Sequence, residues 1–190
     1  NRQAIFLNEG DYVEFDLLLA DALQFYGLDA FGWSLMPNHW HGIVRSPAGG
    51  LSAFMRRVNH RYALRFDRRW KRRAHVFENR FGAVLQQSEE QLLGTLRYVV
   101  RNPVEAGLCA PPFDARWTSF HATAGLVPAP AYLCVGEILG PDPVVVGQHV
   151  DHGRPGGQHA VLHAQVRHAA HDVVDRAVPA VDGPVVQAQL

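Results

Sequence analysis

The stretch LDAFGWSLMPNHWHGIVR, residues 28–45, decides the fold. Two runs rich in aromatic and branched residues, 28–36 and 39–45, flank a Pro-Asn pair that is typical of a turn. Two strands joined by so short a turn pair antiparallel. His39 and His41 stand two residues apart in the second run, so their imidazoles point to one face of a strand. The stretch therefore predicts a β-hairpin that presents two histidines side by side.

Helical patterns lie on both sides of this hairpin. Residues 11–26 carry apolar side chains at helical spacing behind a cluster of acidic residues, and Gly27 is a natural helix end. Residues 51–66 carry a second apolar stripe of the same period. A Ser-x-x-Gln capping box opens a third helix after residue 88, and we expect that helix to end just before Pro103.

Residues 76–85 are expected to be extended and to add a further strand before the third helix. The chain therefore mixes predicted helices with predicted strands. A chain of 190 residues with 47% hydrophobic residues is long and apolar enough for one domain with a substantial core.

Charge is distributed unevenly along the chain, although the formal net charge is zero. Residues 1–50 contain two basic and six acidic residues, whereas residues 51–102 contain twelve basic and four acidic residues. A basic middle segment indicates a polyanionic partner such as a nucleic acid, with a solvated helix face, the more common role of such a stripe, as the alternative. No apolar run approaches the ~18–20 residues of a membrane span. The two cysteines form no disulfide framework, so a reducing cytoplasm is the default expectation.

The composition changes after about residue 140. Residues 141–190 contain no aromatic residue, no isoleucine and no methionine, and they hold six of the eleven histidines. A segment without large apolar anchors has difficulty offsetting its ordering entropy. We therefore expect a poorly ordered, low-complexity tail, with an out-of-frame translation as the alternative. The composition therefore separates residues 1–140 from this tail.

A second pair of polar residues completes a candidate site. Tyr98 and Asn102 are four residues apart on the third predicted helix, so the phenol and the amide share one helix face. Two imidazoles, an amide and a phenol can meet around one divalent metal, and this combination suits phenolic attack on a phosphodiester. Taken singly, a His-x-His on a strand and a tyrosine on a helix are each more often structural. Their joint occurrence favours a catalytic site.

The chain resembles the single-tyrosine HUH transposases, in the branch of REP-associated tyrosine transposases. The resemblance covers about residues 1–125, and its most specific parts are the Met-Pro-Asn-His-x-His and Tyr-x-x-x-Asn-Pro blocks. Further matching segments are Phe54-Met55 to Arg61-Tyr62, His75-Val76-Phe77-Glu78-Asn79-Arg80-Phe81 and Trp117-Thr118-Ser119-Phe120.

The resemblance implies an α/β (α+β), HUH-endonuclease-like fold in which helices pack against a central antiparallel sheet. It also implies a catalytic domain over 1–125, which an extension over 126–140 and the tail over 141–190 would follow. The resemblance further implies a set of roles. His39, His41 and Asn102 would bind Mg²⁺ or Mn²⁺, and Tyr98 would cleave and rejoin single-stranded or hairpin DNA through a phosphotyrosine intermediate. The protein would be bacterial, cytoplasmic and nucleoid-associated, and either a monomer or a homodimer. The residues expected to contact DNA are Arg56, Arg57, Arg61, Arg68, Arg69, Trp70, Lys71, Arg72, Arg73 and Arg80, with the tryptophan stacking on a base.

The chain departs from the family pattern at both ends. The family has a strand before the segment that begins here at Asn1, and without it we expect the sheet to be short of its first strand and to expose an edge. The tail also has no counterpart in the family. These departures motivate an alternative function, a non-catalytic remnant that binds single-stranded or hairpin DNA. A third hypothesis is a hydrolase that uses the same metal with water as nucleophile.

Overall fold

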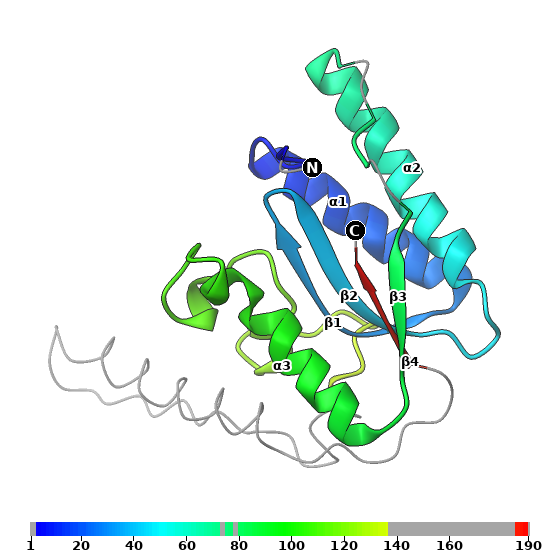
Figure 1. Cartoon of the computed structure of the whole chain (residues 1–190), viewed down its shortest axis with the longest axis vertical. Helices are drawn as coiled ribbons and strands as arrows, with labels where there is room; N and C mark the ends of the chain where they lie inside the picture. The colour runs from blue at the N-terminus through cyan, green and yellow to red at the C-terminus, as the bar shows by residue number, and fades with distance from the viewer. Residues whose placement is uncertain (1–2, 73–74, 78–79, 137–184, 190) are drawn as a thin grey trace, which may run out of the picture.

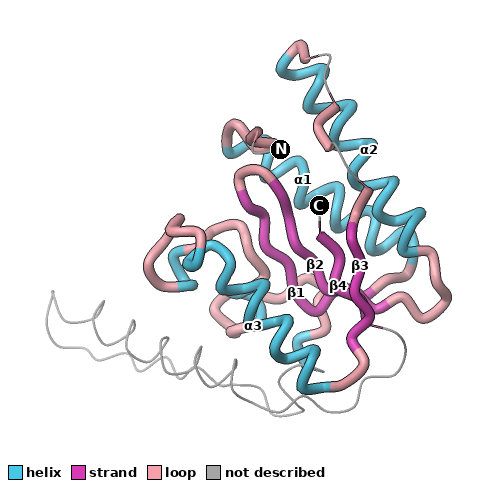
Figure 2. The backbone as a smooth tube through the Cα atoms, in the orientation of Figure 1, coloured by secondary structure: helices cyan, strands magenta, loops and turns pink. Residues whose placement is uncertain are grey.

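The computed structural model describes residues 3–72, 75–77, 80–136 and 185–189. Its strands form one antiparallel sheet in the order β1 (Asp29–Met36), β2 (His39–Arg45), β4 (Val185–Gln189) and β3 (Gly82–Gln86). Helices α1 (Glu9–Tyr26) and α2 (Leu51–Trp70) cover one face of this sheet, and α3 (Glu89–Glu105) covers the other (Figures 1 and 2). Two short helical turns, η1 (Pro112–Asp114) and α4 (Phe120–Thr123), follow α3. The predicted α/β (α+β) fold with a central antiparallel sheet is confirmed.

The hairpin forms as its sequence predicted. β1 and β2 pair antiparallel up to Met36 opposite His39, with one register shift between Ala30 and Gly32. Trp40 is fully buried in the core under α1 and α2, whereas Ile43 is fully buried in the core under α3. Both faces of the hairpin are therefore covered, and strand alternation assigns each side chain to one core or the other.

Helix α1 begins two residues earlier than the apolar pattern predicted. The Asn8 side chain accepts a hydrogen bond from the Asp11 backbone, and the Asp11 carboxylate accepts from the Asn8 backbone, which together form a capping box. Gly27 ends the helix in the left-handed region at φ 59°, as expected. The helix start is thus set by a reciprocal pair of polar side chains rather than by the apolar stripe.

The expected end of the third helix was wrong. α3 begins after Ser88, whose hydroxyl accepts from the Gln91 backbone, but it continues through Pro103 to Glu105. Proline removes a helical hydrogen bond and disfavours helix in the residue before it. Here Pro103 is buried as part of the apolar face of α3, and the Asn102 amide donates to the carbonyl of Tyr98 at 3.0 Å. Burial against the core offsets the local cost.

β4 corrects one expectation about the tail, and β1 and β3 are the outer strands of the open sheet. Residues 185–189 belong to the segment expected to be poorly ordered, yet they form a strand between β2 and β3, so that expectation was wrong for these five residues. Residues 141–184 lie outside the described residues. The edge of β2 that β1 leaves free is paired with β4, so the sheet does not expose it. Within the segment predicted to be extended over 76–85, the described residues form a regular strand from Gly82, and residues 78–79 lie outside the described residues.

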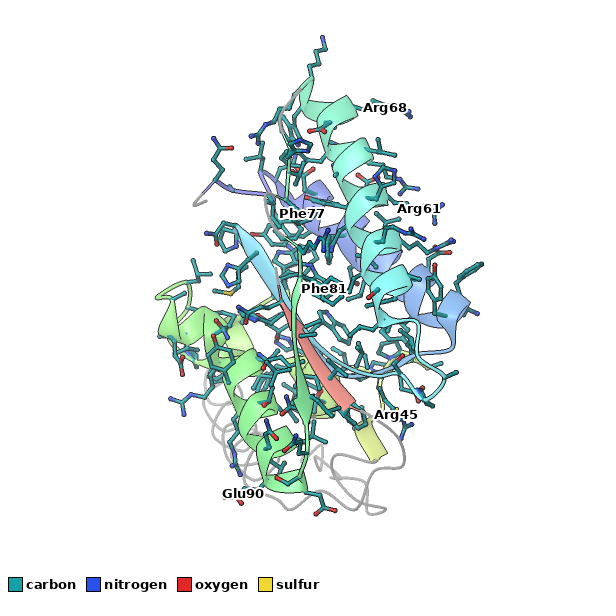
Figure 3. All side chains as sticks on the ribbon, turned by 45° about the vertical axis from the view of Figure 1, so that its right-hand side comes forward. Arg45, Arg61, Arg68, Phe77, Phe81 and Glu90 are labelled. Carbon is teal, nitrogen blue, oxygen red and sulfur yellow. The ribbon has the colours of Figure 1, made fainter. Side chains whose placement is uncertain are left out.

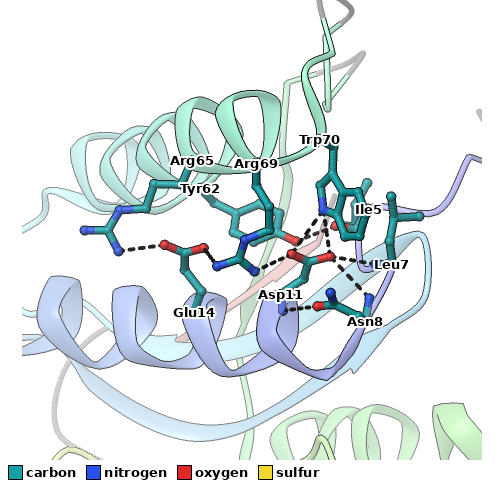
Figure 4. Close-up of polar contacts among 9 residues, drawn as sticks. All are labelled: Ile5, Leu7, Asn8, Asp11, Glu14, Tyr62, Arg65, Arg69 and Trp70. Carbon is teal, nitrogen blue, oxygen red and sulfur yellow. Dashed lines mark hydrogen bonds and ion pairs between the residues drawn. The ribbon is translucent and has the colours of Figure 1, made fainter.

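Ion pairs join α1 to α2 along their length. The Asp11 carboxylate is 1% exposed and accepts from Arg69 at 2.7 Å, from the Trp70 indole at 3.1 Å and from the Leu7 backbone at 2.8 Å (Figure 4). Glu14 pairs with Arg65 and Arg69, and Asp21 pairs with Arg57 and Arg61. Beside Asp11, the buried Tyr62 hydroxyl donates to the Ile5 carbonyl. Much of the charge asymmetry in the sequence is therefore an interface between two helices.

No helix in the described part of the chain is both long and apolar enough to cross a membrane.

We expect Asp11→Ala to lower the free energy of unfolding by about 2–4 kcal/mol, because it leaves buried backbone and indole donors without an acceptor and removes the capping box. Urea denaturation followed by circular dichroism measures the change. Asp21→Ala is the matched control. It also removes an acidic partner of α2 arginines, but its side chain is 50% exposed, so we expect a loss below about 1 kcal/mol. Equal losses in the two variants would contradict the anchoring role of Asp11.

Candidate active site

The two histidines of β2 lie together on the face of the sheet that α3 covers. Their ring centroids are 4.8 Å apart with an interplanar angle of 87°. The side chain between them, Trp40, points to the opposite core, and its indole donates to Asn59 at 3.3 Å. Anchoring of Trp40 therefore fixes both imidazoles on the α3 side, as the alternation in the sequence predicted.

Helix α3 brings Tyr98 onto this pair. The ring centroids of Tyr98 and His41 are 5.6 Å apart with an interplanar angle of 79°, an edge-to-face contact. Tyr98 is 44% exposed, whereas His41 is 2% exposed. The phenol therefore covers a buried imidazole and remains open to solvent and to a substrate.

The position of α3 depends on a close approach at Gly32. A β-carbon added to Gly32 would lie 2.6 Å from a methyl carbon of Leu96, which is on the buried side of α3. The absence of a side chain in the middle of β1 thus lets the helix lie close to the sheet. At the sheet edge, the Thr95 hydroxyl donates to the Gln86 amide oxygen at 2.7 Å. These contacts hold α3 against the sheet and so set the distance between Tyr98 and His41.

The electrostatics of the pair favour neutral imidazoles. Burial lowers the pKa of His39, and burial together with the neighbouring His39 lowers the pKa of His41 to about 4. The Nδ1 of His39 lies 2.8 Å from the side-chain oxygen of Asn38. Because an amide oxygen only accepts, Nδ1 carries the proton and Nε2 keeps its lone pair. Asn38 thereby sets the tautomer of His39, a role that its place in a predicted turn did not indicate.

The ring nitrogens of the two histidines are chemically suited to bind a metal ion. Both ring nitrogens of His41 are buried, and neither has a hydrogen-bond partner among the described residues. A buried polar group without a partner is costly, and a neutral imidazole is a good metal ligand. Among the described residues there is no group of three or more His, Cys, Asp or Glu side chains that could hold a metal. To hold a metal ion, the two histidines would therefore need additional oxygen ligands from amides or water.

Asn102 lies one turn beyond Tyr98 on α3 and is half-buried. Its amide nitrogen donates to the Tyr98 carbonyl at 3.0 Å. That hydrogen bond uses the nitrogen of the amide and leaves its oxygen available to a ligand. The structure thus brings His39, His41 and Tyr98 together. Asn102 lies on the helix of Tyr98, and none of the described hydrogen bonds joins it to either histidine.

The residues predicted to contact DNA fall into three groups. Five have partners within the protein: Arg57 and Arg61 with Asp21, Arg69 with Asp11 and Glu14, Trp70 with Asp11, and Arg72 with Gln3. Four are exposed without a hydrogen bond or ion pair in the described part of the chain: Arg56, Arg68, Lys71 and Arg80. Arg73 lies outside the described residues. Arg61 and Arg68 both lie on α2 (Figure 3). This helix packs on the sheet face opposite the histidines.

Comparison with known proteins identifies a matching family. The family model described as "Transposase IS200 like" matches residues 1–102 of this chain, a range that contains both histidines and Tyr98 and ends at Asn102. No match was found among curated proteins or among solved structures. β4 lies outside the matched range.

The pKa of His41 leads to a prediction for the metal-free protein. In the unfolded chain this histidine takes up a proton near pH 6.5, but in the folded chain it does so only near pH 4. The unfolded state therefore binds more protons between these values, and stability falls as the pH is lowered through that window. We expect His41 to contribute about 3 kcal/mol to this loss between pH 7 and pH 4.

The measurement is urea denaturation of the wild type and of His41→Gln at pH 7, 5.5 and 4 with a chelator present. The variant lacks the titrating group, so its stability should fall less over this range than that of the wild type. Parallel pH profiles for the two proteins would show that the imidazole is not buried in its neutral form.

Proposed function

The chain belongs to the IS200-like transposase family, and we propose that it cleaves and rejoins single-stranded DNA with Tyr98 as the nucleophile. The observation that carries this proposal is the contact of Tyr98 with His41, in which an exposed phenol lies against a buried imidazole that the half-buried His39 adjoins. A strand cleavage reaction requires a nucleophile beside groups that can hold and neutralise a phosphate, and this arrangement suits that requirement.

The proposed reaction exchanges one phosphodiester for another. The Tyr98 oxygen attacks phosphorus, a tyrosine–phosphate bond forms, and the bond from phosphorus to the sugar oxygen of the leaving strand breaks. The phenolic proton is lost to solvent, and the leaving sugar oxygen takes up a proton. Attack by a sugar hydroxyl on the phosphotyrosine reverses these events and releases Tyr98. No oxidant, reductant or nucleotide cofactor is needed for this balance.

The residues around Tyr98 would hold a divalent cation, Mg²⁺ or Mn²⁺, through His39, His41 and the amide oxygen of Asn102. When bound, the cation would neutralise charge on the phosphoryl oxygens and stabilise the developing charge on the leaving oxygen. Asn38 would keep the lone pair of His39 directed at the site through its hydrogen bond to Nδ1. Gly32 would keep Tyr98 at working distance by letting α3 lie close to β1.

The substrate we propose is a single strand flanked by a hairpin, as in the REP-associated branch of these transposases, with the protein at the bacterial nucleoid in the cytoplasm. The exposed, unpaired residues of α2 are the candidates for phosphate contact, and Arg68 and Lys71 lie at the end of α2 beside Trp70. Trp70 is joined through Asp11 to the backbone of Leu7. Just before Leu7, the Ile5 backbone donates to the Pro37 carbonyl in the turn that precedes His39. Although α2 packs on the sheet face opposite the histidines, this end of the helix is therefore linked to the turn that precedes His39.

We expect Tyr98→Phe to abolish a covalent protein–DNA adduct, because phenylalanine keeps the ring contact with His41 but has no nucleophilic oxygen. The full chain is incubated with end-labelled single-stranded hairpin DNA and Mg²⁺ or Mn²⁺ and then resolved on a denaturing gel. Adduct formation should also require the metal and disappear with a chelator. Tyr26→Phe, on the opposite sheet face at the end of α1, is the control and should retain the wild-type yield.

Each outcome of this gel separates the candidate functions. An adduct with the Phe variant would refute the nucleophile assignment. Cut DNA without an adduct from the wild type would favour the hydrolase, in which water attacks. DNA that is bound in a salt-sensitive way but never cut would favour the non-catalytic remnant.

The unpaired basic residues of α2 give a second test. Combined replacement of Arg56, Arg68 and Lys71 by alanine should weaken single-stranded DNA binding and lower the slope of log affinity against log salt by about 2, since each lost phosphate contact removes ~0.7. Fluorescence anisotropy over a salt series measures both quantities.

The matched control replaces three paired arginines of the same helix, Arg57, Arg61 and Arg65, by alanine. It removes the same charge, but these residues are held by Asp21 and Glu14. We expect this control to lower the melting temperature while changing the salt slope less. A larger slope change in the control than in the test variant would place the DNA elsewhere.

A further inference from the structure

One row of residues crosses the whole sheet beneath Tyr98. Ser34 on β1 is opposite His41 on β2, His41 is opposite Gln189 on β4, and Gln189 is opposite Gly82 on β3. Directly opposed residues of antiparallel strands project to the same face, with β-carbons about 4.5–5.5 Å apart. The four positions therefore share the face that carries the histidine pair.

Gln189 is the polar neighbour of His41 in this row. It is exposed, and no described residue makes a hydrogen bond to its side chain. His41 likewise has two buried ring nitrogens without a partner. A buried imidazole and an exposed amide thus form one cross-strand pair, and neither side chain has a hydrogen bond to another described residue.

The position beyond Gln189 is open. Gly82 has no side chain, and a β-carbon placed there would meet no atom within 4 Å. On the other side of His41, Ser34 is fully buried, and its hydroxyl lies 3.8 Å from the sulfur of Met36. Of the two neighbours of His41 in the row, only Gln189 therefore combines an oxygen donor with access to solvent.

We infer that Gln189 supplies an oxygen ligand to the divalent cation that His39 and His41 hold, so that the C-terminal strand completes the metal site. This inference rests on the proposed function. A two-histidine set needs oxygen donors, and amide carbonyls suit Mg²⁺ and Mn²⁺. Gln189 lies outside the matched family range, so this ligand would be a property of this chain's own β4.

The test measures metal binding without DNA and without turnover. Mn²⁺ is titrated into the full chain, and free Mn²⁺ is followed by its electron paramagnetic resonance signal. We expect Gln189→Ala to raise the Kd for Mn²⁺ about tenfold and Gln189→Glu to lower it below the wild-type value, because a carboxylate is a stronger ligand for this ion. Gln187→Ala is the matched control. Gln187 lies on the same strand and face but opposite Ile43, and this variant should stay within about twofold of wild type.

The outcomes distinguish this inference from the proposed function. If His41→Ala abolishes Mn²⁺ binding while Gln189→Ala binds as tightly as the Gln187 control, the ligand role of Gln189 is overturned and the histidine site stands. If the wild type does not bind Mn²⁺, or if His41→Ala binds as well as wild type, the metal site itself is overturned, and the role of Gln189 with it. Far-ultraviolet circular dichroism confirms that each variant is folded.

Discussion

Burial of the β1–β2 hairpin on both faces is the constraint on which the rest of the structure depends. Trp40 belongs to the core under α1 and α2, and Ile43 belongs to the core under α3. Because strand side chains alternate, neither can change sides unless the whole strand shifts its register. His39 and His41 have the same parity as Ile43, so they must face α3. The histidine pair is thus placed by the two cores, and not by a loop that could adjust independently.

The other face of the sheet shows how a helix interface can imitate a nucleic-acid surface in the sequence. The arginines of α2 recur at helical spacing, which is equally suited to a polyanion and to a neighbouring acidic helix. In the fold, Asp11, Glu14 and Asp21 of α1 meet many of them. Partly exposed pairs of this kind add little stability singly, but the buried Asp11 also fixes the start of α1 and the end of α2. The basic side chains that remain available to bind a phosphate are those without an acidic neighbour.

The candidate site draws on segments with different sequence signals. The hairpin and α3 lie within the range that matches the IS200-like transposase family, and their polar residues stand in recognisable blocks. β4 lies outside that range, and its sequence of valine, glutamine and alanine carries no such block. Its pairing between β2 and β3 nevertheless sets Gln189 beside His41. A strand can enter a site through backbone hydrogen bonds alone, which require no particular side chains.

The sequence by itself determined the hairpin, the shared face of His39 and His41, and the one-turn spacing of Tyr98 and Asn102. Each of these features follows from local periodicity, which can be recognised from a few consecutive residues. Only the tertiary structure decided that Tyr98 covers His41 and that α3 continues beyond Pro103. It also decided that arginines of α2 pair with acidic residues of α1, and that β4 is inserted between β2 and β3. Those outcomes depend on contacts between residues far apart in the chain. Such contacts are chosen by packing, burial and sheet register, which neither composition nor local spacing encodes.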